Sequence, residues 1–273
     1  MQNRKLNMEP FPSGHGVQKQ KSFDLYFITS QNSFFMKKLK EIIKAAFYPN
    51  TCPICNAVIG AGEKICRKCV PKIHIIKEPR CEKCGKALLK GDKLYCGDCM
   101  KSVHVFDKGV SIFEYKGDIK ESLYRFKYDN LRCYGDFYGG MGYKMYGRLL
   151  KEWNVKKIIP VPMYNKKEIV RGYNQAAELA KNLSKYTLIP TESHVIIRIK
   201  NTKPQKGLDN LRRQQNLSGA FAVDTSKINK GENVLLVDDI YTTGSTMDAC
   251  ASVLKVAGVG KVYFLCVATG VDN

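Results

Sequence analysis

The sequence predicts an α/β protein in which helices flank a parallel sheet, preceded by a small cysteine-rich domain. From about residue 110 onward, apolar runs such as VSIF, KIIPVP, NVLLVDD and KVYFLCVA alternate with helical stretches such as NQAAELAKNLSKY. This alternation is typical of a parallel sheet covered by helices. Eight of the eleven cysteines lie between residues 52 and 99. The 273 residues suffice for about two domains.

The first 50 residues divide into two segments. Residues 1–35 show no sustained apolar period, so we expect a disordered tail. Residues 36–50 begin with MKKLKEIIKAAF, which places apolar residues at helical spacing and lysines at most of the other positions. We expect one amphipathic helix that packs on its own protein, with a membrane-surface helix as the alternative.

Residues 51–105 contain four Cys-x-x-Cys pairs. The stretches CPICNAVIGAGEKICRKC and CEKCGKALLKGDKLYCGDC repeat one pattern, with equivalent cysteines 29 or 30 positions apart. A structural Zn²⁺ ion bound by four thiolates needs two such pairs. We therefore expect a double zinc ribbon with two structural zinc sites. The expected ligands are Cys52, Cys55, Cys66, Cys69, Cys81, Cys84, Cys96 and Cys99.

The duplication favours two self-contained sites, in which the first two pairs hold one ion and the last two pairs hold the other. A crossed arrangement, first pair with third and second with fourth, is an alternative that the spacing leaves open. Because cysteine fills all four positions, neither ion offers an open position for catalysis. The other three cysteines, Cys133, Cys250 and Cys266, stand alone, and we expect ordinary core or surface thiols.

The chain is strongly basic, with a formal net charge of +20. This excess favours a polyanionic partner such as nucleic acid or a phosphorylated small molecule, with a solvated basic surface as the alternative. No apolar run approaches the ~20 residues that span a bilayer, and the N-terminus lacks the apolar core of a signal peptide. We expect a cytoplasmic protein, either free or at the inner face of the membrane, whose cysteines bind metal rather than form disulfides.

Residues 234–246 read VLLVDDIYTTGST. We expect a buried strand that ends at Asp238 and Asp239, then a loop, then a helix that begins near Ser245. The loop amides, the helix dipole and the hydroxyl groups suit a phosphate monoester. The two acids need hydroxyl donors or a metal beside that phosphate, and a ribose 5-phosphate supplies hydroxyl donors. The loop residues of this expected site are Thr242, Thr243, Gly244, Ser245 and Thr246.

This stretch resembles the signature of type I phosphoribosyltransferases, which bind phosphoribosyl pyrophosphate (PRPP). The resemblance implies a type I phosphoribosyltransferase-like parallel sheet flanked by helices over residues 106–273. It implies a transferase that acts at the anomeric carbon of the ribose, with diphosphate as the leaving group. Asp238 and Asp239 would be the catalytic, ribose-binding acids, and Mg²⁺ would accompany PRPP.

A narrower resemblance extends over most of the chain. The stretches IPVPMYNKKEIVRGYNQAAELA and TKPQKGLDNLRRQQNLSGAF precede the strand and loop just described, and all follow the cysteine-rich domain. In this order they are similar to the ComF family of bacterial competence proteins. That family implies a role in DNA uptake and natural transformation, with single-stranded DNA and competence-machinery proteins such as a DNA-translocating helicase as partners. An active PRPP-dependent transferase of nucleotide or salvage metabolism is the alternative.

The resemblance also implies cations around PRPP. Lys166 and Lys167 follow the strand IIPVP, and Arg171 opens RGYNQ, where an arginine facing solvent is the alternative. Lys203 lies in residues 198–216, which would form a mobile loop that closes over PRPP. An ordinary solvated basic loop is the alternative for that segment.

The segment YRFKYDNLRCYGDFYGG interleaves aromatic and basic residues. Such a mixture suits a single strand, because bases stack on the rings while phosphates meet the charges. We expect half of the rings to lie in the core instead. The aromatic residues are Tyr124, Phe126, Tyr128, Tyr134, Phe137 and Tyr138.

Overall fold

The structure is a computed structural model of the chain. It describes residues 50–60, 62–89, 93–200, 217 and 219–272. The predicted tail, almost all of the predicted helix at 36–50 and most of the expected mobile loop, including Lys203, lie outside these residues. Among the residues that the structure describes, no helix is both long and apolar enough to cross a membrane.

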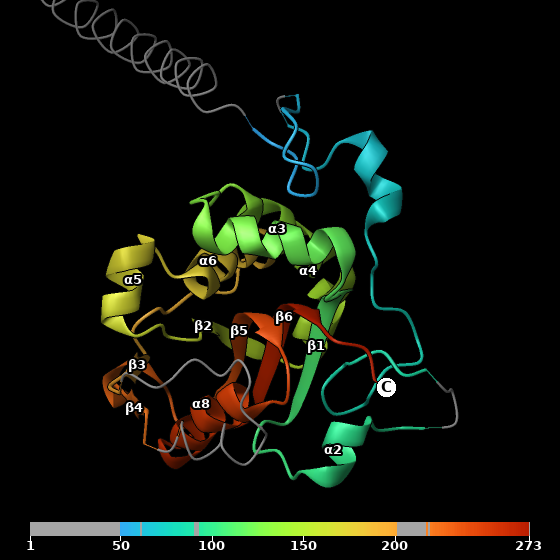
Figure 1. The fold of residues 1–273 in the computed structure, drawn as a ribbon. Coiled ribbons are helices and arrows are strands. Elements are labelled where there is room, and N and C mark those ends of the chain that lie inside the picture. The colour runs from blue at the N-terminus through green and yellow to red at the C-terminus, as the bar shows by residue number, and fades with distance from the viewer. Residues whose placement is uncertain (1–49, 61, 90–92, 201–216, 218, 273) are drawn as a thin grey trace, which may run out of the picture. The chain divides into compact units, whose positions relative to one another are not determined.

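A four-stranded parallel sheet lies at the centre (Figure 1), with the strand order β1-β6-β5-β2. The strands are β1 (Lys108–Glu114), β2 (Val155–Pro160), β5 (Asn233–Tyr241) and β6 (Val262–Thr269). β6 is a nearly continuous apolar run, and β5 is apolar and buried from Val234 to Val237, because helices cover both faces of a parallel sheet. The structure confirms the predicted parallel sheet.

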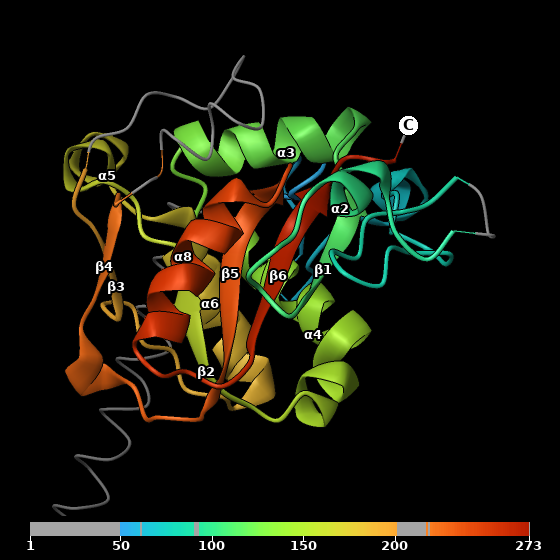
Figure 2. The same ribbon diagram turned by 90° about the horizontal axis from the view of Figure 1, so that it is seen from below.

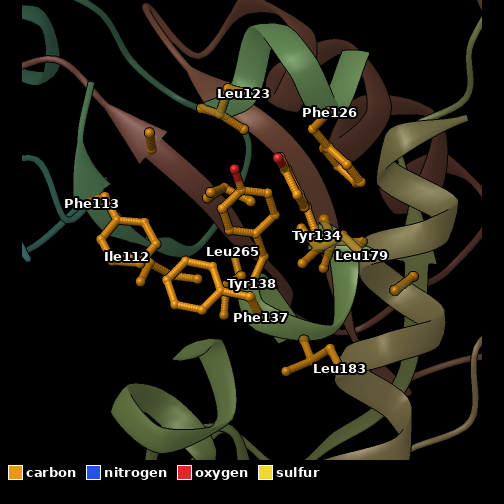
Figure 3. Close-up of a cluster of buried hydrophobic side chains, with 14 of the residues drawn as sticks. Ile112, Phe113, Leu123, Phe126, Tyr134, Phe137, Tyr138, Leu179, Leu183 and Leu265 are labelled. Atoms are coloured by element: carbon orange, nitrogen blue, oxygen red, sulfur yellow. The ribbon is translucent and has the colours of Figure 1, made fainter. Parts of the chain in front are cut away.

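Helices cover both faces of this sheet. Figure 2 shows α8 (Ser245–Val256) on one side, with α4 (Tyr134–Glu152) and α6 (Gln175–Thr187) on the other. Successive residues of β5 point to opposite faces, so Leu235 and Val237 join one buried cluster while Val234 and Leu236 join the other. The cluster under α3 (Gly117–Tyr128), α4 and α6 is rich in aromatic rings (Figure 3).

Short elements complete the described part of the chain. Two small helices, η1 (Arg67–Lys72) and α2 (Gly97–Lys101), belong to the cysteine-rich segment. Helix α5 (Asn165–Arg171) follows β2. Strands β3 (Ile196–Arg198) and β4 (Phe221–Val223) pair antiparallel, and η2 (Thr225–Lys227) leads toward β5.

The two cysteine-rich repeats pack on opposite sides of the sheet. Cys52, Ile54 and Cys69 of the first repeat join the cluster beneath α3 and α4, and Arg125 of α3 donates to the carbonyl oxygens of Pro53 and Ile54. The second repeat adds Cys81, Cys84 and Cys96 to the cluster on the α8 side. The domain boundary between residues 105 and 106 stays a prediction. Residues from both sides of it share the two buried clusters.

Candidate functional site

A pocket with a cavity of ≈ 320 Å³ opens at the carboxyl ends of β2 and β5. This edge is where open α/β sheets bind ligands, because loops and helix N-termini converge there. Asp238 and Asp239 of β5 line it together with Thr246 of α8. The remaining charged lining residues are Lys127, Lys167, Arg171 and Arg198.

Strand β5 does not end at the two acids, as the sequence predicted, but continues to Tyr241. The continuation is held by β6, whose Ala268 and Thr269 pair with Ile240 and Tyr241. The backbone N–H of Asp239 donates to Oδ1 of Asp238 at 2.8 Å. Enclosure by the protein raises the pKa of Asp238 to about 7, and the neighbouring charge of Asp239 acts in the same direction.

Lys127 of α3 also lines this pocket, with its Nζ 2.9 Å from Oδ2 of Asp239. Burial by itself lowers the pKa of Lys127, but the charge and hydrogen bond of Asp239 outweigh it and hold that pKa above its ordinary value. The sequence analysis did not place Lys127 in this site. The available signal was its position directly after the core residue Phe126, at the edge of the buried face of the helix.

Three further cations face the same cavity. Lys167 and Arg171 come from α5 and Arg198 from β3, so the structure places two of the cations selected from the sequence in the lining of this cavity. Arg171 donates to Oε1 of Gln175 at 2.7 Å. Burial and the charges of Arg198 and Arg171 lower the pKa of Lys167. With four cations against two acids, the pocket favours a ligand with several negative charges.

The loop at residues 242–246, here called the hydroxyl loop, joins β5 to α8. Helix α8 begins at Ser245, which confirms the predicted start. Gly244 adopts φ +88° as the residue before the helix, and the Thr243 and Ser245 hydroxyls lie 3.2 Å apart. Thr242 is exposed and Ser245 is buried on the side away from the pocket, so Thr246 is the loop residue that lines it.

Among the described residues, one further predicted cation is not in the pocket lining. Lys166 is exposed on α5 beside the lining residue Lys167. Lys203 lies outside the described residues. Asn174 and Gln175, at the start of α6, line the pocket although the sequence analysis did not select them. The side chain of Asn174 caps this helix by accepting from the N–H of Ala176 at 2.9 Å.

The eight paired cysteines form two clusters, Cys52/Cys55/Cys66/Cys69 and Cys81/Cys84/Cys96/Cys99, each with its sulfur atoms within 4.8 Å of one another. The Sγ atoms of Cys55 and Cys66 are 3.8 Å apart, and those of Cys84 and Cys96 are 3.6 Å apart. A tetrahedron with Zn–S bonds of ~2.3 Å has an edge of ~3.8 Å, so both clusters fit one zinc ion each. The structure therefore has the self-contained pairing and not the crossed one.

Most rings of the aromatic segment belong to the core. Phe126, Tyr134, Phe137 and Tyr138 are buried, so four of the six rings are in the core where the sequence analysis expected half. Tyr124 and Tyr128 of α3 are each 59% exposed, with ring centroids 4.8 Å apart. The guanidinium of Arg171 lies over the Tyr128 ring at 5.0 Å, which connects this exposed pair to the pocket.

Comparison with known families matches two parts of the chain. A family model described as a double zinc ribbon domain matches residues 43–100. A phosphoribosyl transferase domain model matches residues 170–272, which include Arg171, both acids and the hydroxyl loop.

Two competence proteins and a DNA utilization protein are similar to this chain over most of its length. Competence protein F of Haemophilus influenzae is 32% identical over 213 residues, which cover 72% of this chain and 93% of that protein. Competence protein ComFC of Bacillus subtilis is 27% identical over 74% of this chain and 82% of its own length. DNA utilization protein YhgH of Escherichia coli strain K12 is 24% identical over 80% of this chain and 96% of its own length.

Proposed function

This chain belongs to the ComF family of competence proteins, with a double zinc ribbon and a phosphoribosyltransferase domain, and from that premise we propose that its pocket binds PRPP. The main support is the convergence of Asp238 and Asp239 with Lys167, Arg171 and Arg198 in one cavity. Few metabolites combine vicinal hydroxyls, a terminal phosphate and a diphosphate, and PRPP has all three.

Each part of PRPP has a matching group. The 5-phosphate would lie at the hydroxyl loop, where the Thr246 hydroxyl and the backbone amides at the start of α8 would donate hydrogen bonds. The ribose hydroxyls would donate to Asp238 and Asp239. The diphosphate would meet the cations of α5 and β3, and bidentate contacts from Arg171 and Arg198 suit phosphate oxygens.

Mg²⁺ would accompany PRPP rather than occupy a site made by the protein alone. Asp239 already has Lys127 as its counter-ion, and the raised pKa of Asp238 makes that carboxyl a poor ligand below neutral pH. Mg²⁺ keeps several waters and commonly binds through substrate phosphates. When bound there, it would neutralise the diphosphate.

Single-stranded DNA is the second proposed ligand, and the exposed pair Tyr124 and Tyr128 supports it. Stacking of bases on aromatic rings is tolerant of sequence, and the net charge of +20 favours a polyanion. In the proposed role the protein acts in the cytoplasm, free or at the inner membrane face, during DNA uptake and natural transformation. Proteins of the competence machinery, such as a DNA-translocating helicase, would be its partners.

An active transferase is the alternative within the same pocket. Displacement at the anomeric carbon would release diphosphate, and the two acids would stabilise the positive charge that develops on the ribose ring. The acceptor would have to approach from the open side of the pocket.

Calorimetric titration of the whole protein with PRPP and Mg²⁺ tests the proposal. We expect saturable binding by the native protein and weak binding by the double variant Asp238→Asn/Asp239→Asn. Asp224→Asn, which removes an acid remote from the pocket lining, serves as the matched control and should bind normally. Equal affinities for all three proteins would overturn the PRPP proposal. Diphosphate release on addition of candidate acceptors would favour the transferase.

A further inference from the structure

The segment that leaves the second zinc ribbon crosses the start of α8. Nδ1 of His104 lies 2.8 Å from Oδ2 of Asp248, and the N–H of Val105 donates to Oδ1 of the same carboxylate at 2.7 Å. Because a carboxylate only accepts, Nδ1 of His104 carries the hydrogen. Asp248 lies in the first turn of α8, and its own N–H donates to the carbonyl oxygen of Gly244 at 2.8 Å. His104 is therefore connected to the hydroxyl loop through one residue.

His104 also fills the space directly behind that loop. A methyl group built on Gly244 would lie 2.9 Å from Cε1 of His104 and 2.9 Å from the hydroxyl oxygen of Tyr241. Both contacts are shorter than side chains tolerate, so the imidazole and the phenol form a close wall behind the glycine. The imidazole is held in place by stacking on Phe106, with ring centroids 4.7 Å apart.

Two polar atoms of this wall lower the stability of the fold. Nε2 of His104 and the hydroxyl of Tyr241 are both buried, and within the described part of the chain neither has a hydrogen-bond partner. A buried polar atom without a partner destabilises a fold, and an apolar side chain of similar shape would avoid this cost. Nδ1 of the same ring does have a partner, Asp248, so the hydrogen bond of the imidazole is directed at α8.

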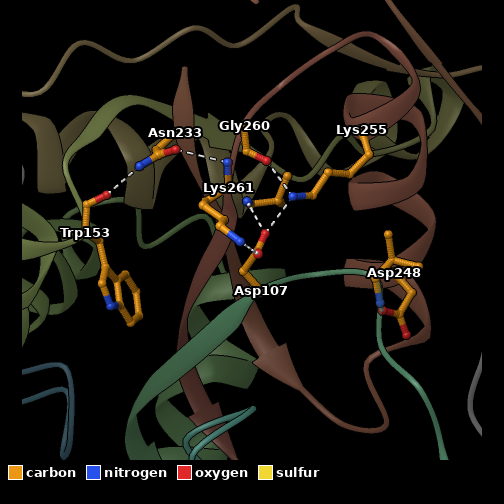
Figure 4. Close-up of polar contacts among 9 residues, drawn as sticks. Asp107, Trp153, Asn233, Asp248, Lys255, Gly260 and Lys261 are labelled. Carbon is orange, nitrogen blue, oxygen red and sulfur yellow. Dashed lines mark hydrogen bonds and ion pairs between the residues drawn. The ribbon is translucent and has the colours of Figure 1, made fainter. Parts of the chain in front are cut away.

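The same segment makes a second contact with α8, which can be compared with that of His104. Asp107 accepts from Nζ of Lys255, in the last turn of α8, at 2.8 Å (Figure 4). The segment therefore fastens α8 at both ends. His104 acts at the end that joins the hydroxyl loop, whereas Asp107 acts at the far end.

We propose that His104 is a positioning residue for the hydroxyl loop. By holding Asp248 and closing the space behind Gly244, it fixes the direction of the loop amides toward the 5-phosphate of the ligand. The inference rests on the proposed function, in which this loop binds the phosphate of PRPP. Since His104 follows Cys99 by five residues, the second zinc ribbon becomes part of the support of the pocket.

Ligands that use different halves of the pocket test this role. PRPP and ribose 5-phosphate engage the hydroxyl loop, whereas inorganic pyrophosphate engages the cations. We expect His104→Leu to weaken PRPP and ribose 5-phosphate binding by about tenfold or more, the size of one hydrogen bond to a charged group. Pyrophosphate affinity should stay unchanged. Lys255→Met, the matched control, should lower the melting temperature without changing any of the three affinities.

Two conservative variants separate positioning from folding. The amide nitrogen of His104→Asn can replace Nδ1 and donate to Asp248, so this variant should keep most of the affinity. His104→Gln places its amide nearer the position of Nε2 and should behave like His104→Leu. Comparison of the asparagine and glutamine variants tests the positioning role even if His104→Leu fails to fold.

The outcomes that overturn the inference are distinct from failure of the proposed function. Native protein that binds PRPP while His104→Leu binds ribose 5-phosphate equally well would overturn the inference alone. Equal losses for pyrophosphate and ribose 5-phosphate, or an effect of Lys255→Met on phosphate binding, would do the same. Native protein that binds neither PRPP nor ribose 5-phosphate would overturn the proposed function and the inference together.

Discussion

Lys127 and Asp239 form an ion pair in the lining of the pocket, with 2.9 Å between Nζ and Oδ2, although they are 112 positions apart in the chain. The pair joins α3 to β5 at the point where the ligand is expected to bind. The charge of Asp239 is therefore balanced before any ligand arrives, and the lysine is available to a bound phosphate or diphosphate.

Replacing Lys127 with Met should destabilise the protein, because it leaves Asp239 largely enclosed without a counter-ion. We expect a loss of about 2 kcal/mol in the free energy of unfolding, below the full cost of breaking a buried pair because both groups keep some contact with solvent. The double variant Lys127→Met/Asp239→Asn should recover most of this loss. Urea unfolding of the native protein, the single variants Lys127→Met and Asp239→Asn and the double variant measures the coupling. Additive effects would contradict an energetic link between the two residues.

Asp238 should make both stability and ligand binding depend on pH. Its pKa is raised to about 7 in the folded protein, from an ordinary value of ~3.9. The folded protein favours the protonated carboxyl of Asp238. The stability that this protonation contributes is therefore full below pH ~3.9 and is lost as the pH rises toward about 7. Binding has the opposite sign: ribose hydroxyls prefer the carboxylate, so PRPP affinity should rise with pH until about 7.

Asp238→Asn is the control for this pH dependence. The phosphates of PRPP change their charge with pH in the same way in both experiments. The difference between native and variant affinities therefore reports the protonation of the Asp238 side chain alone. Parallel affinity curves from pH 5.5 to 8.5 would show that Asp238 accepts no hydrogen bond from the ligand.

Gly244→Ala should abolish tight PRPP binding through crowding of the hydroxyl loop. The alanine would have to keep the backbone angle φ +88°, and its methyl group would press on His104 and Tyr241 at 2.9 Å. Gly231→Ala is the matched control, because that glycine has φ +78° but nothing within 4 Å of the added carbon. The control should lose only ~1 kcal/mol of stability from the left-handed conformation. Equal effects of the two substitutions on stability and on PRPP affinity would contradict the close wall behind Gly244.

Binding of single-stranded DNA should weaken steeply with salt, with a slope of ~0.7 per phosphate contact in a double-logarithmic plot. Tyr124→Ala and Tyr128→Ala should each lower affinity by ~1 to 3 kcal/mol without changing that slope, because stacking releases no counterions. Tyr143→Ala, which removes a ring on α4 that is 41% exposed, is the control. Affinity that is insensitive to salt, or equal losses for all three variants, would argue against this surface.

Removal of zinc should affect more than the ribbons. Metal analysis should return two equivalents, and structural zinc in finger peptides contributes ~10 to 16 kcal/mol per site to folding. Cys99→Ser should lower the hydrogen-exchange protection of α8, since the second ribbon shares a core with Tyr241 and Met247. Cys55→Ser should instead lower the protection of α3 and α4. Fewer than two zinc equivalents, or unchanged α8 protection in Cys99→Ser, would contradict this arrangement.

Local patterns were sufficient for much of the fold and for part of the site. Apolar runs separated by helical stretches predicted the parallel sheet, and the Cys-x-x-Cys spacing predicted both zinc clusters. The start of α8 at Ser245 followed from the change of VLLVDD into hydroxyl residues and glycine. These features depend on neighbours within a few positions of the chain.

Predictions were wrong or missing for features that depend on residues far apart in the sequence. The end of β5 depends on pairing with Ala268 and Thr269 of β6, which no local pattern reports. Lys127 was missed in the pocket because its partner Asp239 is far away in the sequence. Tyr134 donates to Asn56 of the first ribbon, and such packing buries rings that a helical pattern alone leaves ambiguous.

The order of the second ribbon and β6 along the chain has a consequence for biosynthesis. Among the described strands, β1 pairs only with β6, and Phe264 and Cys266 of β6 lie in the same core as the cysteines of the second ribbon. A nascent chain emerges from the ribosome N-terminus first, so the second ribbon is made long before the strand that covers it. A chain arrested before residue 262 would expose thiolates and apolar surface together, and would depend on chaperones and a ready supply of zinc until translation resumed.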